Sequence, residues 1–402
     1  MNRVSLSLLG IAVLAGIAGA QSLYEAEAFG AMTWVEFAGP PAGCGYPNGP
    51  ILASFPYIQA APCFAINPIP AGTIFGDITD NMITDRVYVT DGKSVAEYVA
   101  TTGVQTNVMP VAGAFGTAPL TGLGYDGAKN VLWISDGFTI FGVTPSAPGS
   151  CVPPVMVIPP FAHVGPGLCT DVAWVPSLGI VVACDGAGFV TGYTPAGVVS
   201  IAPYFAAGAC ALAAPLFGIA ADTATGCPAG GPVISISNGV GVARIFLFGG
   251  GAAPPTFYQT AGCSVVPVPF SEGLAYAARP LHYGAGSGPT ITSTGQSCLP
   301  SPTFSIGVTG ANPGGQAFLL VGLTPQCPPL TLVGQPLLLF PISAINGPFP
   351  VGAGGTFTLP APLPAPGGSV PCGLTVFAQW FVKGPGPGWK SSDGLEFSFA
   401  LP

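Results

Sequence analysis

Apolar and polar positions alternate along this chain in short runs that are separated by turn residues. The clearest case is residues 130–143, where two runs of β-branched and aromatic side chains flank Asp136-Gly137. Asp-Gly between such runs is a strong hairpin signal, because a type I′ turn needs positive φ at its central residues. The pattern therefore predicts a hairpin with a type I′ turn at this dipeptide.

Weaker copies of this hairpin recur along the chain. Each turn dipeptide is preceded by a short apolar strand and by an earlier strand and turn, and it is followed by a third and a fourth strand. Four strands per repeat, at a period of about 40 to 50 residues, is typical of a β-propeller blade. Intervals of 45, 49 and 53 residues separate the four dipeptides, which are Asp91-Gly92, Asp136-Gly137, Asp185-Gly186 and Asn238-Gly239.

A fifth repeat is predicted to be divided between the two ends of this region. Residues 271–286 supply two strands, after which the pattern stops. Residues 51–63 align without gaps on residues 198–210, which hold a fourth-strand position, so we expect a fourth strand there and a third strand at residues 31–37. Pairing of these segments would close a ring and leave no open sheet edge. The fold class predicted for residues 21–286 is all-β, a five-bladed β-propeller closed by N-terminal strands.

The repeat resembles the bacterial NHL/YVTN-type propellers, whose blades read roughly as Gly-Ile-Ala-Val-Asp, a turn, a strand ending in Asp and a strand with Arg-Ile. The matching segments are residues 217–222 with Arg244-Ile245, and residues 121–126 with residues 130–136. Most repeats lack the Arg-Ile element. The resemblance covers roughly residues 25–290 and implies a propeller, a fold that hosts both binding proteins and enzymes.

Beyond this region the period is lost. Residues 287–301, rich in Gly, Pro, Ser and Thr, are predicted to be a linker. Six strand-like runs follow in residues 302–402, which is the size of a small β-sandwich. This segment resembles the C-terminal module of many secreted, repeat-bearing bacterial surface proteins, through residues 377–380, a Gly/Pro loop and the closing run 392–397.

The composition agrees with short strands and many turns. The chain of 402 residues holds 60 Gly and 47 Pro, with 6% charged and 49% hydrophobic residues. A helical protein would not tolerate so many Gly and Pro residues, and a disordered chain would be poor in apolar residues.

Residues 1–20 are interpreted as a secretory signal peptide, with Arg3, an apolar run and a small-residue cleavage motif at residues 18–20. The apolar run is short for a bilayer, so we expect no membrane span after its removal. The expected location is extracellular or at the cell surface. Without Arg3, 7 basic and 16 acidic residues give a formal charge of −9, and no Lys/Arg cluster is present, which argues against nucleic acid or anionic lipid as a partner.

Eleven Cys in an exported chain predict disulfides and at least one unpaired thiol. A disulfide that closes a loop of about 20 residues contributes on the order of 3 kcal/mol of stability. Cys184 is expected to remain unpaired. Two pairs are expected from similar spacing (Cys44–Cys63 and Cys151–Cys169), one because it is the only pair in the sandwich (Cys327–Cys372), and two by exclusion (Cys210–Cys227 and Cys263–Cys298).

Three carboxylates offer the only route to a metal. They stand at the start of predicted innermost strands, near one mouth of the central channel, where some propeller enzymes hold Ca²⁺ through carboxylate oxygens. The alternative is that they accept hydrogen bonds from backbone amides at the strand ends. The three are Asp77, Asp171 and Glu272. By contrast, Asp91, Asp136 and Asp185 are explained by turn chemistry alone.

Catalytic motifs are absent from the sequence. It holds no Gly-x-Ser-x-Gly elbow and no His-Glu-x-x-His helix, and its Gly-x-Gly runs lie between strands. His282 could act as a base near Glu272, although a hydrogen-bonded structural histidine is the simpler interpretation. With only two His, far apart, and no Cys-x-x-Cys pair, a structural zinc site is not expected.

The function expected from these features is that of a secreted, non-enzymatic binding or surface-assembly protein without a cofactor, whose partner is a protein or envelope surface. Its surface, poor in charge, favours docking. One alternative is a Ca²⁺-dependent hydrolase or lactonase acting at the channel mouth, and another is a structural component of the cell envelope. The expected contact patch is Phe377, Trp380 and Trp389, with a sandwich-core role as the alternative for the tryptophans.

Overall fold

The structure, a computed structural model, divides into two compact units. Residues 21–37 and 47–278 belong to the repeat unit, and residues 279–401 belong to the C-terminal unit. The structure describes residues 22–27, 31–36, 51–56, 76–81, 84, 86–99, 103–117, 119–209, 212–222, 233–239, 241–248, 256–259, 266–267, 271–277, 281–294, 304–363 and 374–399.

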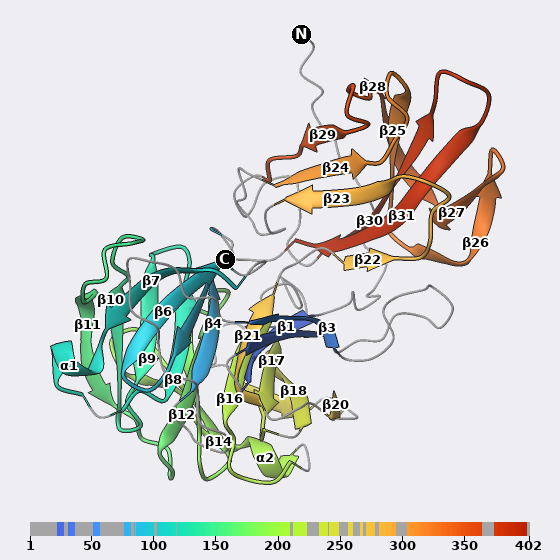
Figure 1. The fold of residues 1–402 in the computed structure, drawn as a ribbon. Coiled ribbons are helices and arrows are strands. Elements are labelled where there is room, and N and C mark those ends of the chain that lie inside the picture. Colours follow the sequence, from blue (N-terminus) through green and yellow to red (C-terminus); the bar gives the residue numbers. More distant parts are fainter. Residues whose placement is uncertain are drawn as a thin grey trace. The chain divides into compact units, whose positions relative to one another are not determined.

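The repeat unit consists of antiparallel sheets whose strands follow chain order (Figure 1). The first sheet is β4 (Asp77–Asn81), β5 (Arg86–Thr90), β6 (Ser94–Val99) and β7 (Gln105–Pro110). The second is β8 (Gly122–Asp126), β9 (Val131–Ser135), β10 (Thr139–Thr144) and β11 (Val155–Ala162). The third is β12 (Cys169–Val175), β13 (Ile180–Asp185), β14 (Phe189–Tyr193) and β15 (Val199–Phe205). The fourth is β16 (Gly218–Asp222), β17 (Val233–Ser237), β18 (Gly241–Phe248) and β19 (Thr256–Gln259), and β20 (Val266–Pro267) also pairs with β18.

A fifth sheet joins strands from both ends of the repeat unit. Its order is β21 (Ser271–Ala277), β1 (Ser22–Glu27), β2 (Ala31–Glu36) and β3 (Ile51–Pro56). The predicted third and fourth strands are therefore at the expected positions. The predicted second strand is wrong, because β1 pairs with β21 along its whole length, whereas β22 (Leu281–Tyr283) belongs to the C-terminal unit.

The first strand of each sheet packs against the first strand of the next. β4 contacts β8, β8 contacts β12, β12 contacts β16, β16 contacts β21, and β21 contacts β4. The approach is close at Gly122 in β8, where an added Cβ would lie 2.5 Å from the Cα of Asp171 in β12. Glycine is required at such a position because the obstruction is backbone, which no rotamer change relieves.

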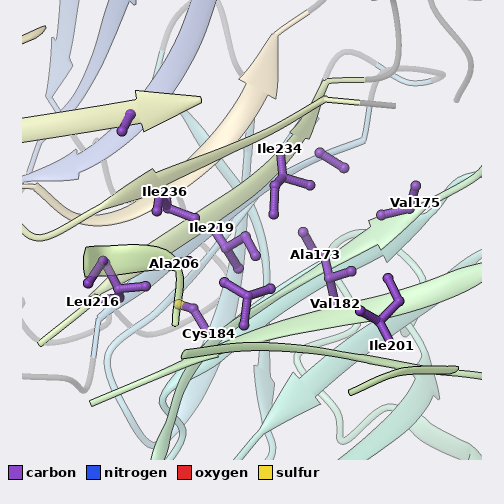
Figure 2. Packing of buried hydrophobic residues seen from close by; sticks show 14 of the residues in the cluster. Ala173, Val175, Val182, Cys184, Ile201, Ala206, Leu216, Ile219, Ile234 and Ile236 are labelled. Carbon is purple, nitrogen blue, oxygen red and sulfur yellow. The ribbon is translucent and has the colours of Figure 1, made fainter. Parts of the chain in front are cut away.

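The core of the repeat unit lies between adjacent sheets. Figure 2 shows Ala173 and Val182, from β12 and β13, facing Ile219 and Ile234, from β16 and β17. Between the second and third sheets, the rings of Trp133 and Trp174 stack with centroids 5.9 Å apart. This face-to-face packing explains why the strands are buried on both sides and carry continuous apolar runs.

The turns between second and third strands depend on Asp side chains, as expected. Asp136 Oδ1 accepts hydrogen bonds from the N–H groups of Phe138 and Thr139, at 3.1 and 2.8 Å. The predicted type I′ turn is nevertheless wrong, because Gly137 has φ of 88° while Asp136 does not have positive φ. A type I′ turn needs positive φ at both central residues, and here the aspartate carboxylate organises the turn instead.

Two sheets and a hairpin form the C-terminal unit. One sheet has the order β22, β31 (Trp389–Ser398), β30 (Thr375–Lys383), β25 (Gln316–Gly322) and β28 (Ile342–Pro350). The other is β23 (Thr290–Thr294), β24 (Ser305–Thr309) and β29 (Phe357–Pro360), and the hairpin is β26 (Pro325–Leu332) with β27 (Gln335–Leu339). β23 lies inside the predicted linker, so the linker prediction for residues 287–301 is wrong over that strand.

The strand β30 of the five-stranded sheet is buried on both faces. On one face, Trp380 packs with Ile306 of the three-stranded sheet, and on the other, Phe381 packs with Leu339 of the hairpin. Gln379 is buried in the same strand, and its Oε1 accepts the N–H of Leu338, in the hairpin, at 2.9 Å. Its Nε2 donates to two backbone carbonyls, at 3.0 and 2.8 Å. The sandwich therefore has a third layer that the strand pattern did not predict.

Helices are short throughout the described residues. α1 (Ala112–Phe115) and α2 (Ala206–Ala209) have four residues each. In the part of the chain that the structure describes, no helix has the length and apolar character needed to cross a membrane.

Candidate functional site

Two of the three predicted metal ligands meet in the repeat unit. Asp77 is the first residue of β4 and Asp171 lies near the start of β12, and both are fully buried. Their carboxyl groups are hydrogen-bonded to each other. The sequence therefore identified two carboxyl groups that do meet, although β8 contacts both of their strands and lies between them in the order of contacts.

Backbone N–H groups occupy most of the oxygens of this pair. Asp77 Oδ2 accepts the N–H of Leu123 in β8. Asp171 Oδ1 accepts the N–H of Val172 at 2.5 Å, and its Oδ2 accepts the N–H of Ile219 in β16 at 2.6 Å. Only Asp77 Oδ1 has no backbone donor. The interpretation of these carboxylates as acceptors for strand-end amides thus applies to both.

Burial changes the protonation of the pair. Removal from water raises the pKa of Asp171 above its usual range, against the partial opposition of the Asp77 and backbone hydrogen bonds. Burial, together with the neighbouring Asp171 charge, also raises the pKa of Asp77 well above its usual range. Two carboxylates in contact and away from water cannot both be ionised at low cost, so the pair retains at least one proton at neutral pH.

These residues do not fit calcium. Ca²⁺ takes about six to eight oxygen ligands, and three of the four carboxyl oxygens of the pair are already engaged by N–H donors. Among the described residues, no group of three or more His, Cys, Asp or Glu side chains is arranged to hold a metal. The side chain of Glu272, in β21, lies outside the described residues.

Two thiols lie beside the acid pair. Cys169 and Cys184 are unpaired and fully buried. Burial, followed by the charge of Asp171, raises the pKa of the Cys184 thiol well above its usual range. A thiol of this kind is neither nucleophilic nor accessible, which agrees with an inert role for Cys184.

The predicted Cys151–Cys169 disulfide is wrong. Cys169 is a free thiol, whereas Cys151 takes part in a disulfide with a different residue. The reason is geometric: Cys169 is paired with Asp185 in the interior of a sheet, while Cys151 lies in an exposed loop next to Asn107 of β7. The other predicted disulfide residues lie outside the described residues or have side chains that are not described, namely Cys44, Cys63, Cys210, Cys227, Cys263, Cys298, Cys327 and Cys372.

The predicted contact patch is also wrong in two of its three residues. Trp380 is fully buried and Phe377 is 3% exposed, and each packs in a core of the C-terminal unit. Trp389 is half-buried and packs against Phe318, with ring centroids 5.5 Å apart. Because β30 is covered on both faces, Phe377 and Trp380 do not form a free surface.

His282 lies in β22, which belongs to the C-terminal unit. Its Nδ1 lies 2.8 Å from Asp393 Oδ2, and Asp393 Oδ1 accepts the N–H of Ile291 at 2.8 Å. The contact links β22, β31 and the first part of β23. This favours the structural interpretation of His282 over a base acting with Glu272.

A surface that the sequence did not predict lies at the turn end of the second and third sheets. Four side chains there are exposed: Phe138 (62%), Val164 (51%), Leu168 (43%) and Phe205 (48%). We call these four residues the turn-end face. Backbone hydrogen bonds bring their segments together, from His163 N–H to Phe138 O at 2.8 Å and from Gly186 N–H to Leu168 O at 2.9 Å.

Side chains fix the loop that carries Val164 and Leu168. The Tyr193 hydroxyl accepts the N–H of Val164 at 3.0 Å and is hydrogen-bonded to His163 Nδ1 at 2.9 Å. Gly167 N–H donates to Asp185 Oδ2 at 3.2 Å. The apolar side chains are therefore held on an anchored loop. A sequence signal existed at Phe138, because the equivalent turn position is Lys93 in the first repeat and Ala187 in the third, so the turn does not require an aromatic residue there.

No family model matches the chain, and no curated protein is significantly similar to it. Among solved structures, it is similar to BBS1N in complex with ARL6DN, with 9% identity over 58% of this chain and 65% of that chain, and a TM-score of 0.31. It is also similar to KlHsv2 with loop 6CD replaced by a Gly-Ser linker, with 10% identity over 61% of this chain and 72% of that chain, and a TM-score of 0.30. A third similar structure is the WD40 β-propeller domain of Doa1, with 11% identity over 58% of this chain and 64% of that chain, and a TM-score of 0.29. The chain thus spans less than two thirds of the first of these. At such TM-scores the assignment rests on the sheets themselves, which make the repeat unit propeller-like and almost entirely β.

Proposed function

We propose that this chain is a non-enzymatic binding or surface-assembly protein, and that its repeat unit is a closed five-bladed propeller that docks a protein partner on the turn-end face. The cyclic contacts of β4, β8, β12, β16 and β21 support the ring. In a ring of four-stranded blades, the turns between second and third strands lie at the same end as the connections between blades. This is why Phe138 and Leu168, from two kinds of connection, are neighbours.

The observation that carries the proposal is the exposure of four large apolar side chains on an anchored surface. Exposed apolar clusters on soluble proteins mark interaction sites more often than scattered single residues do. The acidic groups of the same turns do not offset this character, since Asp136 and Asp185 are turned inward to accept N–H bonds. Aromatic side chains on a rigid support are also typical of binding hot spots.

The proposal includes export. Residues 1–20 have the pattern of a signal peptide, and the disulfide at Cys151 fits an oxidising compartment. Membership of the NHL/YVTN-type propellers and assembly on a cell surface are part of the same proposal. The family membership is proposed from segments such as residues 217–222, which form β16 and the residue before it.

Photo-crosslinking of the full chain in its producing cells tests this docking surface. A photoreactive phenylalanine analogue replaces Phe138 in one variant and Ile345, in β28, in a matched control. Both positions have 62% exposed side chains, so solvent access is equal. We expect a discrete protein adduct from position 138 that weakens at least tenfold when Leu168→Asp is added, since burying a charge at a hot spot costs more than about 1.4 kcal/mol. Equal adducts at both positions, or none at position 138, would contradict the proposal.

A further inference from the structure

We infer that Asp77 and Asp171 form a metal-free clamp, in which Asp77 holds a proton on Oδ1 and donates it to an ionised Asp171. The clamp links four first strands. Asp77 joins β4 to β8 through the Leu123 N–H, Asp171 joins β12 to β16 through the Ile219 N–H, and the shared proton joins β4 to β12. In this chain a proton and backbone amides therefore occupy the position expected for calcium. This inference does not depend on the docking proposal.

The donors around each carboxyl group decide which residue carries the proton. Both oxygens of Asp171 accept a backbone N–H, whereas only Oδ2 of Asp77 does. Hydrogen bonds to the charged form favour ionisation, so Asp171 is the better carboxylate. Asp77 Oδ1 is buried and has no other partner, which leaves it as the atom that bears the proton. The raised pKa of Asp77 agrees with this order.

No cation among the described residues that face the pair offsets its charge. The titratable groups nearest to it are the thiols of Cys169 in β12 and Cys184 in β13, and both are held neutral by burial. The remaining first strand, β21, contributes Glu272, whose side chain is not described. The proton on Asp77 thus does what a bound cation would do, because it lowers the charge of two buried carboxyl groups by one.

The clamp makes the two residues unequal. Asparagine at position 77 keeps every hydrogen bond, since its amide N–H replaces the proton toward Asp171 and its carbonyl oxygen accepts the Leu123 N–H. Asparagine at position 171 cannot do so, because its amide would point hydrogen atoms at the N–H of Val172 or Ile219. In a calcium site the two substitutions would act alike, since each would remove a charged ligand.

The test compares the full chain with D77N and D171N in thermal unfolding at neutral pH, with a chelator and with about 10 mM calcium chloride, above the Kd range of extracellular calcium sites. We expect calcium to leave the Tm of the full chain unchanged. D77N should unfold within about 3 °C of the unsubstituted chain, and D171N about 5 to 10 °C lower. Failure of D171N to fold, beside a folded D77N, is the stronger form of the same result.

Two results would overturn the inference. One is a calcium-dependent rise in Tm that both variants abolish, which would restore the metal site. The other is equal destabilisation by the two variants, or a D77N chain that does not fold, which would mean that Asp77 is not the protonated partner. The far-ultraviolet circular dichroism of each variant separates loss of folding from a lowered Tm.

Discussion

Gly122→Ala should destabilise the repeat unit through one steric contact. An added Cβ would lie 2.5 Å from Asp171 Cα and 2.9 Å from both Asp171 C and Val172 N. These are backbone atoms, so β8 and β12 must separate, at an overpacking cost of about 1 to 3 kcal/mol. A shift of β8 also disturbs the hydrogen bond from Leu123 N–H to the buried Asp77 of β4, which adds about 1 kcal/mol or more. The lower chain entropy of alanine in the unfolded state offsets about 0.4 to 1 kcal/mol, leaving a net loss of about 1 to 4 kcal/mol.

Equilibrium unfolding in guanidinium chloride, followed by tryptophan fluorescence, measures this loss, because Trp133 and Trp174 are buried as a stacked pair in the repeat unit. Gly113→Ala is the matched control: it lies in α1, and its Cβ would meet nothing within 4 Å. Alanine in a helix is favoured over glycine by about 0.5 to 1 kcal/mol, so this variant should be as stable as the original or slightly more so. If the two variants unfold within about 0.5 kcal/mol of each other, the close approach of β8 and β12 is incorrect.

Three further predictions concern pH, a buried amide and the free thiols. Burial raises the pKa of both carboxyl groups above the 3.8 of the unfolded chain, so the stabilisation from their retained protons is complete below that pH and declines as the pH rises through the raised pKa values of the folded pair. The unfolding free energy should decline by at most about 1.4 kcal/mol per pH unit for each retained proton. Asp77→Asn should flatten this pH dependence, measured by urea unfolding between about pH 5 and 8. An unchanged slope in the variant would exclude the acid pair as the source of the pH dependence. Gln379→Leu should lower the unfolding free energy of the C-terminal unit by about 2 to 4 kcal/mol, because it leaves one N–H and two carbonyls without partners. A change in unfolding free energy below about 0.5 kcal/mol, measured by denaturant unfolding, would contradict this expectation. Cys169 and Cys184 should not react with Ellman's reagent until denaturant is added, since burial keeps them as thiols, and rapid labelling of the native chain would show that they are accessible.

Local sequence chemistry predicted much of the repeat unit. The strands around residues 130–143 form where the apolar runs are, and Asp136 organises its turn through N–H groups two and three residues away. These hydrogen bonds join residues only two or three positions apart, so the local sequence pattern is enough to predict the strands and the turn. The likeness between residues 51–63 and 198–210 even predicted a fourth strand far from its sheet in sequence, because both strands meet the same surroundings.

The choice among distant partners could not be predicted in the same way. Residues 22–27 and 281–283 are both short strands, and only the tertiary structure decides that the first pairs with β21 and the second with β31. The sequence left Trp380 open between a contact patch and a sandwich core, and it is buried because a second sheet and a hairpin cover both faces of its strand. Spacing likewise suggested Cys151–Cys169, whereas the sheet interior holds Cys169 away from the loop of Cys151.

For the candidate site, the sequence determined which residues are acidic and where their strands begin, and it named Asp77 and Asp171. Only the tertiary structure decided their chemistry, because it brings two strands from different sheets together and aims the N–H groups of two others at the same carboxyl groups. The reason is physical: a carboxyl group's protonation and ligands depend on burial and on the donors within a few ångströms, and neither quantity is carried by the order of residues along the chain.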